Sequence, residues 1–294
     1  MPDRQISVTA GEAVLAEAVA VCKKDLGERL IAAYALGSLA HGGFSSLVSD
    51  VDLGVVLSDP VEQSDNAAIQ KVADAVRTGG SDLHERLSIF WGTPAILGGS
   101  STGGRFPPLD RLDLLEHGRL LSGRDVREGI ARPSRSELLT VGAEFALDYL
   151  GGRRDAQISG SPSLGSMSPG DDSVLAEIRS PALLILRGAR RLTKVVLFPV
   201  RFLYTAQTGQ VGTNAIAVTR YLADPQAPAG ELVTAALGWR LAPPTDTSQA
   251  LALLARDLIP LYMHFIADHQ TRLIAAGRSD LAECFEQWRL SLRA

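Results

Sequence analysis

The chain has 294 residues, which is long enough for one large or two medium-sized domains. Of these residues 46% are hydrophobic and 21% are charged, a composition that excludes a disordered or fibrous protein. The formal net charge of -4 argues against general electrostatic binding to nucleic acid or to an anionic membrane. The N-terminus has no signal-peptide pattern, and no uncharged apolar run is long enough to cross a membrane. We therefore expect a soluble cytoplasmic protein. In that compartment its two cysteines, Cys22 and Cys284, are expected to be reduced.

The first part of the chain predicts an alternation of helices and strands. Apolar residues at helical spacing indicate a helix over 11–29, and the nearly all-apolar run at 30–36 indicates a buried strand that stops at Gly37. The same criteria predict the following further elements: a strand at 51–57, a helix at 65–80, a strand at 86–92, a helix at 109–118 and a short strand at 119–123.

Strand-like runs are no longer found after Asp125. The remaining sequence predicts helices at 137–152, 180–209 with a kink at Pro199, 213–222, 229–240, 248–275 and 278–292. The segment 151–172 is rich in Gly, Ser and Pro and is expected to be a flexible loop. We therefore predict an α/β (α+β) domain with a mixed sheet over residues 1–125 and an all-helical domain over residues 126–294.

Residues 37–53, GSLAHGGFSSLVSDVDL, hold the densest group of candidate site residues. Asp50 and Asp52 alternate along a strand, so both side chains point the same way and their carboxylates can share a divalent cation. Oxygen ligands favour Mg²⁺, which also binds waters and substrate phosphates. Gly37 and Ser38, at a turn from strand to helix, offer N–H groups and a hydroxyl to such phosphates. The stretch therefore predicts a site for Mg²⁺ and a triphosphate, although an isolated Asp-x-Asp pair is more often a solvated turn.

This succession of a strand, Gly-Ser, a short helix, Ser-Asp-x-Asp and a second strand resembles the signature of the polymerase-β-type nucleotidyltransferase superfamily. The segment 194–218, KVVLFPVRFLYTAQTGQVGTNAIAV, further resembles the helical domain of the aminoglycoside (streptomycin/spectinomycin) adenylyltransferases. The resemblance implies a sheet that carries catalytic carboxylates and a helical bundle that closes over the nucleotide and the acceptor. It also implies an antibiotic-resistance type of reaction, in which AMP is transferred from ATP to a hydroxyl of an aminoglycoside-like small molecule and pyrophosphate leaves.

Residue by residue, the resemblance implies the following roles. Gly37 and Ser38 would hold the β- and γ-phosphates, and Ser49 would support the loop. Asp50 and Asp52 would bind the Mg²⁺ ion and carry catalysis.

The predicted helix at 180–209 carries a stripe of basic side chains. Its members share one face of a straight helix and are Arg187, Arg190, Arg191, Lys194 and Arg201. For most of them, a solvated face or pairing with acidic residues is the favoured interpretation. Arg201 is predicted to contact phosphate, because it lies in an apolar context and matches the family motif.

Two positions depart from the family pattern. The family places a third carboxylate, a metal ligand or general base, on the strand where this chain has Ser88. We predict Glu85 as the replacement and keep Asp82 as its alternative; either can serve only if the strand begins earlier or is bent. Asn214 stands where the adenylyltransferases have a phosphate-contacting lysine.

These departures leave two alternatives to transfer to a small molecule. One is a nucleotide-binding regulatory protein with weak or lost transferase activity. The other is a nucleotidyltransferase that modifies a protein hydroxyl, as antitoxin-type members of the superfamily do.

Overall fold

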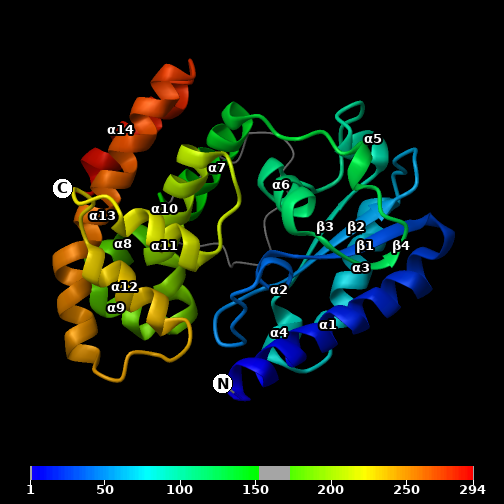
Figure 1. Cartoon of the computed structure of the whole chain (residues 1–294), viewed down its shortest axis with the longest axis horizontal. Coiled ribbons are helices and arrows are strands. Elements are labelled where there is room, and N and C mark those ends of the chain that lie inside the picture. Colours follow the sequence, from blue (N-terminus) through cyan, green and yellow to red (C-terminus); the bar gives the residue numbers. More distant parts are fainter. Residues whose placement is uncertain (1, 152–172, 294) are drawn as a thin grey trace. The chain divides into compact units, whose positions relative to one another are not determined.

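The computed structural model describes residues 2–151 and 173–293, and these form two compact units (Figure 1). Within the described residues, the first unit ends at Pro133 and the second begins at Ser134. The first unit extends beyond residue 125 because Ile130 is buried in the core beside the sheet and Val126 packs against that core. The expected flexible loop at 151–172 lies, after its first residue, outside the described part of the chain.

A mixed four-stranded sheet with the order β3-β2-β1-β4 forms the centre of the N-terminal unit (Figure 1). Its strands are β1 (Leu30–Leu36), β2 (Val51–Leu57), β3 (Leu87–Gly92) and β4 (Arg119–Gly123). β1 is antiparallel to β2 and β4, whereas β2 and β3 are parallel. The predicted mixed sheet and its strands are confirmed.

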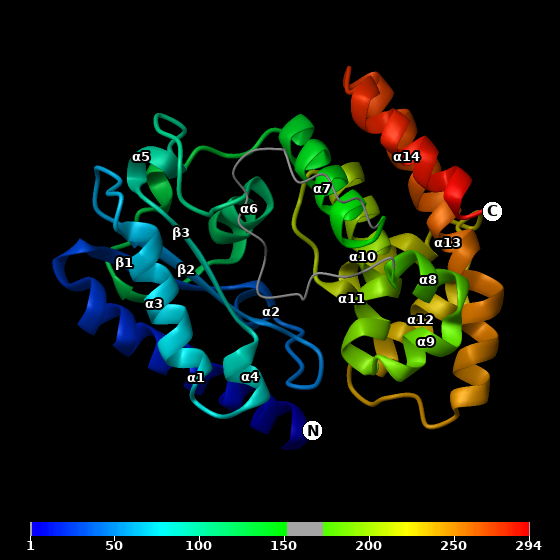
Figure 2. The same ribbon diagram turned by 180° about the vertical axis from the view of Figure 1, so that it is seen from behind.

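Helices cover both faces of this sheet (Figure 2). On one face lie α1 (Pro2–Leu26) and α3 (Asp65–Arg77); on the other lie α5 (Pro94–Leu97) and α6 (Pro108–His117). The unit also contains the short helices α2 (Gly37–His41) and α4 (Asp82–Glu85) and the 3-10 turns η1 (Gly27–Arg29) and η2 (Arg127–Gly129). The sequence did not predict α4 and α5, and α1 begins well before residue 11.

The alternation of side chains along β2 decides where the candidate site lies. Val51, Leu53 and Val55 are fully buried against α1 and α3. Successive strand residues point to opposite faces, so Asp52 points to the face that α6 covers. On β3, Leu87 and Ile89 are also buried on the side of α1 and α3. Ser88 lies between them and therefore points to the same face as Asp52.

The C-terminal unit is all-helical in its described residues, as predicted. Its helices are α7 (Arg135–Tyr149), α8 (Ser173–Arg179), α9 (Pro181–Leu186), α10 (Ala189–Thr208), α11 (Asn214–Leu222), α12 (Gly230–Trp239), α13 (Thr247–Ala275) and α14 (Ser279–Ser291). The predicted single helix over 180–209 is wrong, because the chain breaks at Gly188, whose φ of 84° is outside the helical range. Pro199, in contrast, lies inside the continuous α10.

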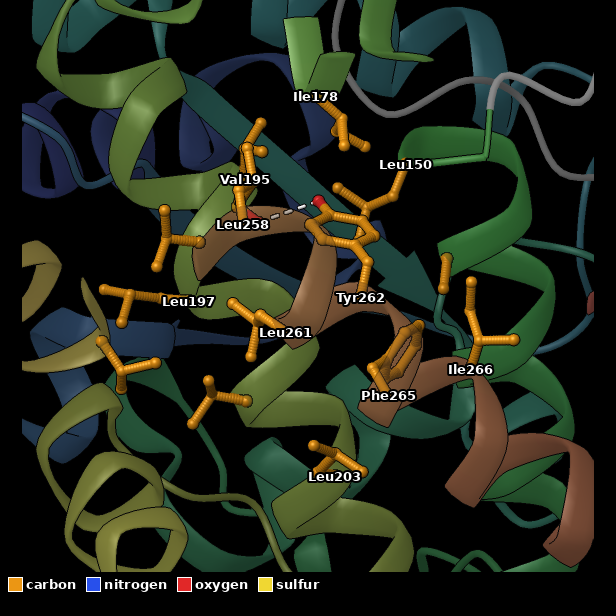
Figure 3. Packing of buried hydrophobic residues seen from close by; sticks show 14 of the residues in the cluster. Leu150, Ile178, Val195, Leu197, Leu203, Leu258, Leu261, Tyr262, Phe265 and Ile266 are labelled. Atoms are coloured by element: carbon orange, nitrogen blue, oxygen red, sulfur yellow. Dashed lines mark hydrogen bonds between the residues drawn. The ribbon is translucent and has the colours of Figure 1, made fainter. Parts of the chain in front are cut away.

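The core of this unit is centred on α13. Leu258, Leu261 and Phe265 are 0% exposed, and Tyr262 donates a 2.9 Å hydrogen bond from its hydroxyl to the carbonyl of Val195 (Figure 3). Among the described helices, α13 alone is long and apolar enough to cross a membrane. In this helix 44% of the most apolar window is buried inside the unit, and a core helix can have the same composition.

The two cysteines are thiols in different units, in agreement with the prediction. Cys22 is buried on α1, and Cys284 is half-buried on α14.

Candidate functional site

The turn after β1 lies directly against the Asp52 carboxylate. Leu36, the last residue of β1, is paired with Asp52 at the start of β2. Gly37 follows with a φ of +59°, and a Cβ atom at this position would overlap the Oδ2 atom of Asp52. Only glycine fits there without strain or displacement. Ser38, in the first turn of α2, is half-buried beside this contact.

The loop between α2 and β2 is held together by Ser49. Its hydroxyl accepts a 3.1 Å hydrogen bond from the N–H of Ser45, and its own N–H donates to the Ser45 carbonyl at 2.8 Å. Arg86 fixes the same loop from the side of β3 by donating to the carbonyl of Ser46 at 2.9 Å. Ser49 is 6% exposed, so it supports the loop that leads to Asp50.

The third carboxylate expected on the next strand is replaced by a hydroxyl. In the parallel register of β2 and β3, Ser88 stands directly opposite Asp52. Glu85 and Asp82 lie on α4 and are exposed, whereas β3 begins only at Leu87. The condition under which Glu85 or Asp82 could take this role, an earlier or bent strand, is therefore not met.

Helix α6 brings two other carboxyl groups to this face of the sheet. The Oδ2 atom of Asp113 accepts a 2.5 Å hydrogen bond from the N–H of Gly37. Asp113 is 6% exposed, and its Oδ1 atom is buried without a hydrogen-bond donor in the described part of the chain. Asp110 precedes Asp113 by one helical turn, and therefore lies on the same side of α6. The bond from Gly37 uses the N–H that the sequence had assigned to phosphate.

The negative charges in this group act on one another. Burial of its carboxyl, followed by the charges of Asp52 and Asp113, raises the pKa of Asp110 to about 8, while Arg105 acts in the opposite direction. Crowded carboxylates disfavour ionisation in this way when no cation compensates them. The carboxyl of Asp110 therefore lies in a buried and acidic environment.

Arg105 is a basic residue close to these acids. Its Nη1 atom donates to the carbonyl of Ile89 at 3.0 Å, and its guanidinium lies 5.1 Å from the centre of the Phe90 ring. Burial lowers its pKa, and the charges of Asp110 and Asp52 oppose this effect. The Nε and Nη2 atoms are buried and find no acceptor among the described residues.

The donor set fits a hydrated Mg²⁺ ion. Asp50 and Asp52 provide hard oxygen atoms, and the unpaired Oδ1 of Asp113 adds a buried carboxylate oxygen nearby. Within the described residues, no three Asp, Glu, His or Cys side chains are already arranged to enclose a metal ion. Mg²⁺ commonly uses only one or two protein carboxylates and keeps several waters, so this arrangement remains compatible with it.

The basic stripe predicted from the sequence does not exist as one surface. Arg187 caps α9, and the break at Gly188 separates it from α10. Arg187 and Arg191 both pair with the buried Glu177, at 3.3 and 2.8 Å, in agreement with the acidic pairing favoured for most of these residues. Arg201 is half-buried on α10, in the C-terminal unit.

Sequence reasoning missed Asp110, Asp113 and Arg105. The helix over 109–118 was predicted, but no role was given to its acids. A signal was present, because Asp113 lies between Leu112 and Leu114, which are both 0% exposed. A carboxylate within the apolar part of a helix needs a compensating partner and is a candidate for function.

The structure combines a mixed four-stranded sheet, a Gly-Ser turn against an Asp-x-Asp strand and an all-helical C-terminal unit. No protein-family model and no curated protein sequence matches the chain. Among solved structures, it is similar to the crystal structure of spectinomycin adenyltransferase AAD(9) from Enterococcus faecialis with ATP and spectinomycin. The TM-score is 0.56 at 14% identity, over 85% of this chain and 98% of the other. At this identity the likeness shows the fold, and the expected resemblance is confirmed at that level.

Proposed function

We propose that this protein is a Mg²⁺-dependent nucleotidyltransferase that transfers AMP from ATP to a hydroxyl of a small, aminoglycoside-like molecule. The main support is the contact of Gly37 with the Asp52 carboxylate at the junction of β1 and β2. The choice of substrates is supported by the similar AAD(9) structure, which was determined with ATP and spectinomycin.

In this proposal, Asp50 and Asp52 hold the cation. When bound, Mg²⁺ would offset negative charge on the triphosphate and on the leaving pyrophosphate. Ser38 and the first turn of α2 orient the phosphates, and Ser49 keeps the loop in place through its bonds to Ser45. The oxygen of the acceptor hydroxyl attacks the α-phosphate in line, the bond to the β-phosphate oxygen breaks, pyrophosphate leaves, and the hydroxyl proton passes to water. The side chains act mainly by positioning and electrostatics.

Arg201 and the cellular location remain predictions. We keep Arg201 as the proposed phosphate ligand from the helical region, because of its apolar context and the motif around it. We also keep the proposal that the protein works in the cytoplasm.

Pyrophosphate release tests the transfer reaction. Purified protein is incubated with ATP, Mg²⁺ and each of a panel of hydroxyl acceptors that includes spectinomycin. We expect release that requires both Mg²⁺ and one acceptor, and a loss of about 100-fold or more in Asp52→Asn, because charge stabilisation of the transferring phosphate is lost. Equal release by wild type and Asp52→Asn would contradict the proposal.

A second candidate is a nucleotide-binding regulatory protein. Ser88 opposite Asp52 favours it, since a serine hydroxyl does not take up a proton at neutral pH without help. Tight ATP binding without pyrophosphate release, for any small-molecule or protein acceptor, would favour this candidate. Release with a protein acceptor alone would favour the protein-modifying alternative.

A further inference from the structure

The position next to Asp52 on β3 lacks the acid that the proposed reaction needs. Ser88 occupies it, and the register of β2 and β3 leaves no ambiguity about the pairing. A serine hydroxyl can donate and accept hydrogen bonds but carries no negative charge for a cation. A replacement acid must therefore reach the same face of the sheet from another element.

Helix α6 is anchored so that it can supply this acid. Leu112 and Leu114 are fully buried, and Asp113 holds α6 to the turn at Gly37 by its 2.5 Å hydrogen bond. Asp110 lies one turn before Asp113, on the side of α6 that faces the turn. The packing of α6 and the hydrogen bond between Asp113 and Gly37 thus set the position of Asp110 relative to Asp52. This position does not depend on a long loop.

Two further observations indicate that this group of acids receives a ligand. The Oδ1 atom of Asp113, a residue that is only 6% exposed, has no donor in the described part of the chain. Arg105 lies within electrostatic reach of Asp110 and Asp52, but its buried Nε and Nη2 atoms bond to neither. Buried polar atoms without partners are costly unless a ligand or water satisfies them.

We propose that Asp110 is the third acid of the divalent-cation site, supplied by α6 in place of the carboxylate expected on β3. The proposal rests on the proposed function, because it assumes that Asp50 and Asp52 bind the cation. Mg²⁺ retains several waters, so an acid that is near Asp52 without sharing an inner coordination site can still hold the hydrated ion. Asp110 would then raise the affinity for the cation and fix its position over β2.

Cation affinity tests this role without any need for turnover. Mn²⁺ binding is measured by electron paramagnetic resonance of the free ion, in the presence of a non-hydrolysable ATP analogue. The variants are Asp110→Asn, Asp110→Glu and Asp52→Asn, with Asp74→Asn as the matched control. Asp74 is an exposed acid on α3, which covers the opposite face of the sheet.

We expect Asp110→Asn to weaken Mn²⁺ binding by roughly tenfold or more, because the hydrated cation would lose the attraction of a nearby negative charge. Asp110→Glu should recover most of the affinity, and Asp74→Asn should bind like wild type. Unchanged affinity in Asp110→Asn, or an equal loss in the Asn and Glu variants, would overturn the role of Asp110. If Asp52→Asn also binds Mn²⁺ like wild type, the proposed function itself fails, so the two failures are distinguishable.

Discussion

At the scale of single residues, Gly37 joins backbone conformation to the candidate site. Its φ is +59°, and an added Cβ would overlap the Oδ2 atom of Asp52. We expect Gly37→Ala to displace the Asp52 carboxylate, to weaken Mg²⁺-dependent ATP binding by about tenfold or more, and to lower the free energy of unfolding by about 1–3 kcal/mol. Calorimetric ATP titration and urea denaturation measure the two effects.

Gly27 provides a control for the conformational part of this effect. Its φ of +53° is similar, but nothing lies within 4 Å of an added Cβ. Gly27→Ala should therefore lose stability and retain ATP binding. If both variants bind ATP like wild type, the contact between Gly37 and Asp52 has no role in nucleotide binding.

The residues of the site differ in how far the sequence could predict them. Gly37, Ser38, Asp50 and Asp52 belong to one short segment, whose strand–turn–strand pattern is local. Asp113 binds Gly37 from 76 residues away, so their proximity depends on how α6 packs on the sheet. No local pattern encodes that packing, so the acids predicted from the sequence, Glu85 and Asp82, are ones that lie close to β3 along the chain.

At the scale of elements, periodicity located the strands and most helices, but it missed the break between α9 and α10. Gly188 has φ 84° and ψ 172°, a conformation open essentially only to glycine. Pro199 was the more conspicuous helix breaker in the sequence, yet α10 continues through it. The break depends on a backbone conformation that composition alone does not reveal.

We expect Gly188→Ala to lower the free energy of unfolding by about 1–3 kcal/mol, because alanine is strained in this conformation. No atom lies within 4 Å of the added Cβ, so the cost would be conformational and not steric. Urea denaturation of the purified protein measures it.

Gly238 on α12 is the matched control. It also has open space around an added Cβ, and its φ is not positive. Gly238→Ala should raise the free energy of unfolding by up to about 1 kcal/mol, since alanine favours the helix. Equal effects of the two substitutions would contradict the expectation that alanine is strained at Gly188.

At the scale of the whole molecule, the two-part organisation could be predicted, because strand-like runs end near Asp125 and helical periodicity continues.

The free energy of unfolding should depend on pH through a buried histidine in the C-terminal unit. His269 is 1% exposed, its ring is stacked on Phe285, and Phe265 lies 4.3 Å away between ring centres. Burial lowers the pKa of His269 to about 4; Asp268 opposes this shift, and Arg272 adds to it.

The sign of the pH effect follows from this direction. Above the unfolded-state pKa of about 6.5, His269 is neutral in both states and the stability is fully present. Below it, only the unfolded chain takes up the proton, so stability falls until the pH reaches about 4. We expect a loss of about 3 kcal/mol from this group over that interval.

Urea denaturation between pH 7 and pH 4 tests this expectation. His269→Phe, which keeps an aromatic ring beside Phe265 and Phe285, should reduce the loss of stability on acidification. The same pH dependence in wild type and His269→Phe would show that His269 does not cause it.

The central claim is that the turn at Gly37 and the carboxylate of Asp52 form a Mg²⁺-dependent nucleotide site. Isothermal titration of ATP into wild type and Asp52→Asn, each with Mg²⁺ and with a chelator, tests it most directly. We expect wild type to bind ATP at least about tenfold more tightly with Mg²⁺ and Asp52→Asn to lose this difference. ATP binding that is independent of Mg²⁺ and unaffected by Asp52→Asn would contradict the claim.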